Sequence, residues 1–146
     1  MGRFIQSLTS MKPTKRSILY LTEAEIILVN ERMVAKYGGL HGVKDIHMLG
    51  LAAGRPQMSI GFHDAYRTIF DKAAALFDSI IRNHPFLDGN KRTSLFSAIL
   101  FLESNGWSVI FKRKEGVKFT RKVHDNRLSV EEISNWLKIH SEKPKN

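Results

Sequence analysis

The sequence predicts a single all-α domain, a bundle of five or six helices. Its 146 residues are enough for one hydrophobic core. Most of the chain divides into segments whose apolar residues recur at helical spacing, and several segments begin with a capping box or end at glycine. Alternation of apolar and polar residues is confined to residues 107–111 (WSVIF). We therefore expect at most one short strand or hairpin.

Capping signals and glycines divide the N-terminal half into three predicted helices. Thr22 and Glu25 form a capping box ahead of a wide apolar face. Gly38 and Gly39 accept the left-handed conformation that closes a helix. The predicted helices cover residues 22–37, 45–53 and 63–82, with residues 38–42 and 54–56 as connections.

Three further helices are expected in the C-terminal half. The second long helix begins near Asn90 and ends before Gly106. Ser129 and Glu132 form another capping box ahead of the last helix. The predicted helices cover residues 90–103, 115–124 and 129–140.

The first 20 residues show little periodicity and contain a Lys12-Pro13 breaker. We predict an N-terminal arm over residues 1–20 and one domain over residues 21–146. The N-terminus lacks the apolar stretch of a signal peptide. No apolar run approaches the roughly 20 residues that span a bilayer. These features favour a cytoplasmic protein that does not enter a membrane.

The formal net charge of +9 favours anionic partners. Lysine and arginine are concentrated in residues 112–122 (KRKEGVKFTRK). No interleaved aromatic residues or nucleic-acid motif accompany this basic segment, so direct binding of nucleic acid is not expected. A solvated surface is the simpler interpretation of the segment. The absence of cysteine excludes disulfides, thiolate metal sites and cysteine nucleophiles.

The segment between the two long predicted helices carries the candidate chemistry. It reads HPFLDGNKRT over residues 84–93. Pro85 stops the preceding helix, so His84 is presented at a helix end. A histidine with an ordinary pKa near ~6.5 is suited to take a proton from an attacking hydroxyl. For an isolated histidine, the alternative is a helix C-terminal residue that interacts with the helix dipole.

The second half of this segment predicts an anion site with a bound cation. Gly89 permits a tight turn, after which the next helix points its free N–H groups toward the loop. Lys91 and Arg92 add two positive charges, which suits a polyphosphate. Asp88 would repel such a ligand unless it holds Mg²⁺, which binds through one or two carboxylates and substrate phosphates. Together these residues describe phosphoryl or nucleotidyl transfer.

Simpler explanations exist for each residue alone. Asp88 is also a common N-cap residue, and Gly89-Asn90 is an ordinary turn sequence. Lys91 and Arg92 are compatible with a solvated surface. The functional interpretation rests on the combination, because coincidence would have to explain all five polar positions together.

The segment resembles the signature of the Fic/Doc family, His-x-Phe-x-Asp/Glu-Gly/Ala-Asn-Gly/Lys-Arg. Residues 37–45, 54–57 and 100–106 look like flanking features of the Doc (death-on-curing) branch. The resemblance covers roughly residues 21–111 and implies a Fic-fold helical bundle. The matching positions are His84, Phe86, Asp88, Gly89, Asn90, Lys91 and Arg92.

Two positions are similar to Doc rather than to the adenylylating Fic enzymes. Lys91 stands where those enzymes carry glycine, and Leu95 stands where they carry a second arginine that holds the nucleotide phosphates. The resemblance implies an NTP- and Mg²⁺-dependent protein kinase that passes the γ-phosphate of ATP to a protein hydroxyl. The family target is a threonine of elongation factor Tu, whose phosphorylation halts translation. AMP transfer to a protein is the alternative, and a non-catalytic basic binding module is a second one.

The roles expected of the signature residues follow from this resemblance and from their chemistry. The base accepts the proton of the target hydroxyl, the carboxylate holds Mg²⁺, and the cradle binds the phosphates. The expected base is His84, and the expected metal ligand is Asp88. The expected phosphate cradle consists of Gly89, Asn90 and Lys91, and Arg92 is the expected catalytic charge partner of the transferred group.

The resemblance also implies an antitoxin. Many Fic proteins inhibit themselves through a Ser/Thr-x-x-x-Glu-Gly/Asn helix, and no serine or threonine of this chain has glutamate four residues later. We therefore expect a type II toxin–antitoxin pair with a separate Phd-like partner whose tail folds on binding. Such tails are often acidic, which would give the basic segment 112–122 a use.

Overall fold

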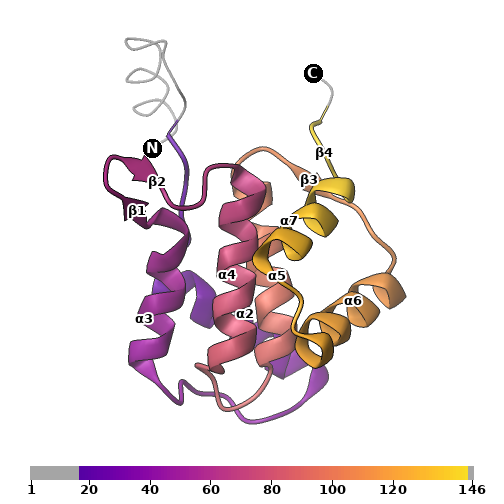
Figure 1. Ribbon diagram of the computed structural model, residues 1–146. Coiled ribbons are helices and arrows are strands. Elements are labelled where there is room, and N and C mark those ends of the chain that lie inside the picture. The colour runs from indigo at the N-terminus through magenta and orange to yellow at the C-terminus, as the bar shows by residue number, and fades with distance from the viewer. Residues whose placement is uncertain (1–16, 145–146) are drawn as a thin grey trace, which may run out of the picture.

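The computed structural model describes residues 17–144, which form a helical domain (Figure 1). The predicted all-α fold is confirmed, with six α-helices and one 3₁₀ turn in this part of the chain. The helices are α2 (Glu23–Tyr37), α3 (Ile46–Gly54), α4 (Ile69–Asn83), α5 (Asn90–Ser104), α6 (Arg113–Asn126) and α7 (Val130–Ile139), and the 3₁₀ turn η1 (Arg55–Gln57) follows α3.

Helix α4 lies at the centre of the domain, packed against α3, α5 and α7 (Figure 1). Its alanines Ala73, Ala74 and Ala75 are fully buried, and their small side chains let neighbouring helices approach closely. Phe77 is also fully buried and packs edge to face against Phe119 of α6. The end of α4 is therefore held in a fixed position relative to α5 and α6.

The predicted start of the central helix at residue 63 is wrong. Residues 59–64 instead form a hairpin of β1 (Ser59–Ile60) and β2 (His63–Asp64). Gly61, at a φ of 63°, makes the turn. The helix begins at Ile69, because the Thr68 hydroxyl accepts a hydrogen bond from the Asp71 N–H at 3.0 Å and so caps it.

Two short strand pairs are present in residues 17–144, where the sequence led us to expect one at most. The stretch predicted to be extended contains β3 (Ser108–Val109), which pairs with β4 (Ser141–Glu142) after the last helix. This pairing joins residues that are distant in the sequence, so local alternation of residues could not reveal it.

Only residues 17–20 of the predicted N-terminal arm lie within the described residues, and they pack on the domain. The Asn105 side chain bonds the backbone N–H and carbonyl of Leu19, both at 2.9 Å. Tyr20 stacks on Phe101 with ring centroids 5.9 Å apart. The rest of that arm, residues 1–16, lies outside the described part of the chain.

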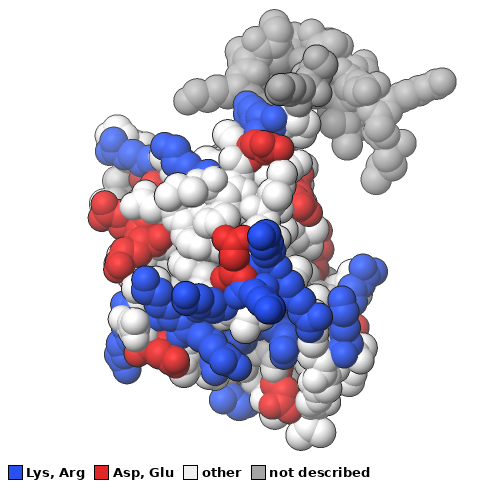
Figure 2. Space-filling view, turned by 90° about the vertical axis from the view of Figure 1, so that its right-hand side faces the viewer, with Lys and Arg blue, Asp and Glu red and all other residues white. Residues whose placement is uncertain are grey.

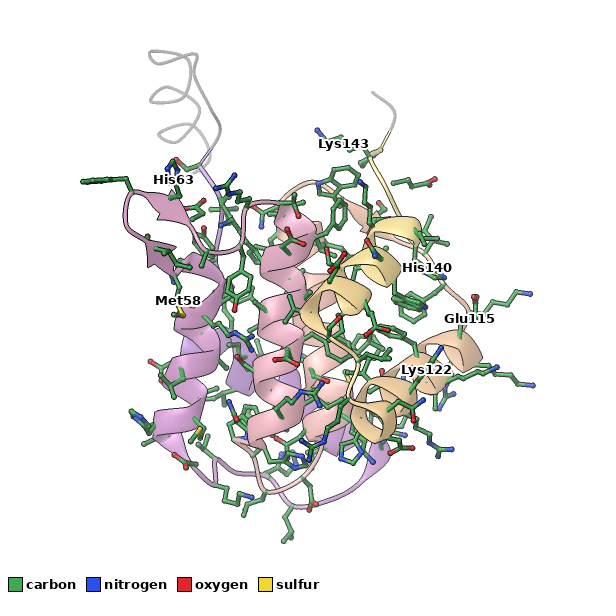
Figure 3. The ribbon with its side chains drawn as sticks, in the orientation of Figure 1. Met58, His63, Glu115, Lys122, His140 and Lys143 are labelled. Carbon is green, nitrogen blue, oxygen red and sulfur yellow. The ribbon has the colours of Figure 1, made fainter. Side chains whose placement is uncertain are left out.

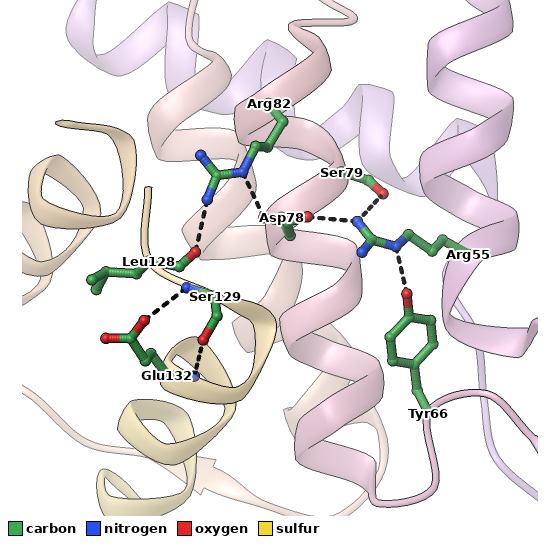
Figure 4. Close-up of polar contacts among 8 residues, drawn as sticks. All are labelled: Arg55, Tyr66, Asp78, Ser79, Arg82, Leu128, Ser129 and Glu132. Atoms are coloured by element: carbon green, nitrogen blue, oxygen red, sulfur yellow. Dashed lines mark hydrogen bonds and ion pairs between the residues drawn. The ribbon is translucent and has the colours of Figure 1, made fainter. Parts of the chain in front are cut away.

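A carboxylate on α4 links the central helix to both flanks (Figure 4). Asp78 accepts from Arg55 of η1 at 2.7 Å and from Arg82 of α4 at 2.9 Å. Arg55 also donates to the Tyr66 hydroxyl, and Arg82 donates to the Leu128 carbonyl ahead of α7. These contacts fix η1 and the α6–α7 connection to the helix that ends at the candidate site.

Candidate active site

The loop between α4 and α5 is closed by one buried asparagine. Asn90 Oδ1 accepts from the Phe86 N–H at 3.0 Å, and Asn90 Nδ2 donates to the Phe86 carbonyl at 2.9 Å. Phe86 is 1% exposed and anchors the loop in the core. The side chain of Asn90 is therefore occupied by the backbone of its own loop. Its predicted contribution to a phosphate cradle is limited to its backbone N–H.

The loop also pairs with the segment that precedes α3. The N–H groups of Lys44 and Asp45 donate to the Pro85 carbonyl at 2.8 and 3.1 Å, and the Leu87 N–H donates to the Gly42 carbonyl at 3.0 Å. Bonds on both sides of the loop leave little freedom for its backbone. Side chains that the loop carries are thus positioned before any ligand binds.

His84 is the C-cap residue of α4, in the left-handed conformation with φ 47° and ψ 61°. The following proline disfavours the right-handed helical conformation at this position, and the His84 N–H still donates to the Ile80 carbonyl at 3.1 Å. Its side chain is partly exposed, in agreement with the prediction of a histidine at a helix end.

The surroundings of His84 favour its neutral form. Partial burial lowers the pKa of His84 below its ordinary value, and His124, Lys44 and Lys91 lower the pKa further by their positive charge. A contact with the Ile81 backbone opposes this shift. An imidazole that is neutral at physiological pH is able to accept a proton.

Asp88 has one carboxylate oxygen held by the protein. Its Oδ2 accepts from the Leu40 N–H at 2.7 Å, and its backbone carbonyl accepts from the buried Asn30 amide at 2.8 Å. A Cβ at Gly39 would lie 2.8 Å from the Asp88 Cβ, so glycine allows this close approach. Within residues 17–144 no hydrogen bond reaches Oδ1, which leaves that oxygen for a cation.

The donor set fits Mg²⁺ only if the substrate supplies further ligands. Residues 17–144 contain no cluster of three or more histidine, cysteine or acidic side chains that could hold a metal by themselves. Mg²⁺ usually keeps several waters and binds through one or two carboxylates together with phosphate oxygens. Asp88 alone is compatible with that mode of binding.

Helix α5 begins beside this carboxylate without a side-chain cap. Gly89 is its N-cap residue, at φ 78°, and no side chain of residues 17–144 accepts from the N–H groups of residues 90–92. A Cβ at Gly89 would lie 3.1 Å from side-chain atoms of both Asn30 and Val34. Uncapped N–H groups and the positive end of the helix dipole attract anions.

A cavity of about 520 Å³ adjoins the start of α5. Lys91 and Arg92 are exposed at its edge, and the Arg92 guanidinium lies 3.9 Å from the centre of the Tyr37 ring. Basic side chains gather over this face of the molecule (Figure 2). The cavity is lined by Lys36, Tyr37, Lys91, Arg92, Leu95, Phe96, Phe111, Arg113, Gly116, Val117, Thr120 and Arg121.

The predicted site residues therefore lie on one loop and the first turn of the helix that follows it. The basic segment 112–122, which the sequence left unassigned, forms much of α6 and faces the same cavity. Tyr37, Lys44 and His124 were not predicted as neighbours of the site. Tyr37 and Lys44 belong to the glycine-rich stretch that resembles Doc, whereas no local pattern distinguishes His124.

Comparison with known proteins assigns the family. The family model described as "Fic/DOC family" matches residues 20–102, more than half of the chain, and the chain belongs to this family. The match includes the loop between α4 and α5. The resemblance predicted from residues 84–93 is thereby confirmed.

Two curated relatives identify the branch. "Toxin Doc" of Mycolicibacterium smegmatis is 47% identical over 70 residues, which cover 48% of this chain and 54% of that protein. The match thus spans about half the length of the mycobacterial protein. "Protein kinase doc" of Escherichia phage P1 is 30% identical over 119 residues, which cover 82% of this chain and 93% of that protein.

No helix in residues 17–144 combines the length and the apolar character needed to cross a membrane.

Proposed function

We propose that this protein is the toxin of a type II toxin–antitoxin pair and transfers the γ-phosphate of ATP, or of another NTP, to a hydroxyl of a target protein. One observation carries the proposal. A proton acceptor, a carboxylate with a free oxygen and an uncapped helix N-terminus lie on one rigid loop beside a cavity. The names "toxin" and "protein kinase" of the two relatives agree with it.

His84 accepts the proton of the target hydroxyl while the oxygen of that hydroxyl attacks the γ-phosphorus of the nucleotide. The bond from that phosphorus to the bridging oxygen breaks, and the nucleoside diphosphate leaves. The N–H groups at the start of α5 and the Lys91 ammonium bind phosphate oxygens, and Arg92 neutralises charge on the transferred group. Mg²⁺, held by Asp88, supplies further charge neutralisation when it is bound.

Phosphate transfer is favoured over AMP transfer by the cavity wall at Leu95. This side chain is 4% exposed and lines the cavity, so the position offers no cation for nucleotide phosphates. We propose that the target belongs to the translation machinery, with a threonine of elongation factor Tu as the family target, and that the protein acts in the cytoplasm.

We also propose that a Phd-like antitoxin neutralises the protein. The exposed basic residues of α6 beside the cavity are suited to an acidic antitoxin tail (Figure 2). A tail bound there would lie next to Arg92 and Lys91 and would block access to the site.

The test is incubation of the purified protein and elongation factor Tu with ATP labelled on either the γ- or the α-phosphate. Label from the γ-phosphate alone supports phosphate transfer, and mass spectrometry distinguishes an added phosphate from an added AMP. His84→Ala is expected to lower the rate by roughly 10²–10⁴, since a general base contributes about that factor. Unchanged transfer with His84→Ala would refute the role of His84 as the base, and growth arrest that persists in a variant without transfer would refute the catalytic proposal and favour a binding module.

A further inference from the structure

A second histidine faces His84 from α6. His124 lies in the last turn of that helix, and its ring centroid is 6.1 Å from that of His84 with the planes tilted by 58°. The side chain is 37% exposed, so it can exchange protons with solvent. The loop signature does not include this residue, and its position beside the base comes from the packing of α6 alone.

Asp125 holds the His124 ring. His124 Nδ1 lies 2.9 Å from Asp125 Oδ1. A carboxylate only accepts hydrogen bonds, so Nδ1 carries the proton and Nε2 is the acceptor of the neutral ring. The hydrogen bond from His124 is the main cause that lowers the pKa of Asp125, with smaller contributions from the charges of Lys91 and Arg121.

Charged groups face His84 from three elements. Lys44 belongs to the segment before α3, Lys91 to the first turn of α5, and His124 with its partner Asp125 to the end of α6. Lysine stays charged throughout the physiological pH range, whereas histidine is the side chain that gains and loses its charge within that range.

We propose that His124 is a positioning residue whose positive charge keeps the His84 imidazole neutral and so extends transfer from this site to lower pH. The proposal rests on the proposed role of His84 as the base. Two imidazolium rings at this separation repel each other, so a proton on His124 keeps His84 in its neutral, proton-accepting form. Asp125 fixes the orientation of His124 and offsets part of its charge.

The test is an NMR titration of the His84 ring in the full chain, with two substitutions of opposite effect. His124→Gln removes the charge and keeps a donor for Asp125, so His84 should titrate at higher pH than in the wild type. His124→Lys introduces a permanent charge, so His84 should titrate at lower pH than in the wild type. A purely structural role would shift both variants in the same direction.

A matched control is His63→Gln. His63 is exposed on β2, at the end of the domain far from the α4–α5 loop (Figure 3). The titration of His84 should be the same in this variant as in the wild type. If it shifts as it does in His124→Gln, the effect is not specific and the proposal fails.

The rate of transfer gives a second readout. In His124→Gln the rate should fall below that of the wild type on the acidic side of the pH–rate profile, and His124→Lys should restore activity there. The proposal is overturned if His84 titrates alike in the wild type and both His124 variants. An inactive protein in which His84 shifts as expected would refute the proposed function while supporting the coupling of the two rings.

Discussion

Asn90→Ala should disturb stability and activity together, because Asn90 closes the catalytic loop. The substitution removes two hydrogen bonds, of 3.0 and 2.9 Å, and leaves the N–H and carbonyl of the buried Phe86 without these partners. At about 1–1.5 kcal/mol for each bond, the expected loss in the free energy of unfolding is about 2–3 kcal/mol. For a domain of this size, that corresponds to a drop in Tm of roughly 5–10 °C.

Asn105→Ala is the matched control for this prediction. Asn105 makes the same kind of paired hydrogen bonds to the backbone of Leu19, which is exposed, and a further bond to the Phe101 carbonyl, at a half-buried position remote from the loop. Water can replace those bonds, so the loss of stability should be smaller and activity should be retained. Thermal unfolding measures stability, and transfer of label from the γ-phosphate measures activity at a temperature where all proteins are folded.

Two results would refute this account of the loop. In one, Asn90→Ala retains the wild-type Tm, which would mean that the two bonds contribute no net stability. In the other, Asn90→Ala and Asn105→Ala lose activity equally, which would mean that the loss reflects general destabilisation.

Three further predictions concern the remaining groups of the site. Gly39→Ala should raise the Mg²⁺ concentration needed for half-maximal activity, because the added Cβ would lie 2.8 Å from the Asp88 Cβ. Gly38→Ala, which is also at positive φ but has open space around it, controls for backbone strain. Equal effects of the two substitutions would argue against displacement of the Asp88 carboxylate. Activity should persist as the pH falls to about 6.5 and be lost at lower pH, since the pKa of His84 is lowered and its neutral form is the base; a midpoint above that value in the pH–rate profile would contradict this assignment. Tyr37→Ala should weaken nucleotide binding about two- to fivefold in calorimetry, since it removes the ring beneath a guanidinium at 3.9 Å. Tyr37→Phe, which keeps the ring face, should bind as the wild type does, and weakening in both variants would assign the effect to the hydroxyl.

Local sequence was sufficient for most helices of the described chain and for the motif. Capping boxes at Thr22 and Ser129 mark helix starts that the structure confirms, because a cap and an apolar face act within one helical turn. Local sequence was not sufficient to place the start of α4, because the predicted helix included residues that form a hairpin instead. Hairpin and helix compete over this stretch, and Gly61 with the Thr68 cap decides between them.

The sequence by itself determined the all-α class, the family and the set of groups offered for phosphate transfer, since each depends on neighbours in the chain. Only the tertiary structure decided how those groups are used. It occupies the Asn90 side chain with the Phe86 backbone, directs one oxygen of Asp88 to Leu40, and brings α6 with its basic face and His124 against the loop. The contact of Asp88 with Leu40 and the packing of α6 join segments far apart in the sequence, and they form only when burial of the common core fixes the helices relative to one another.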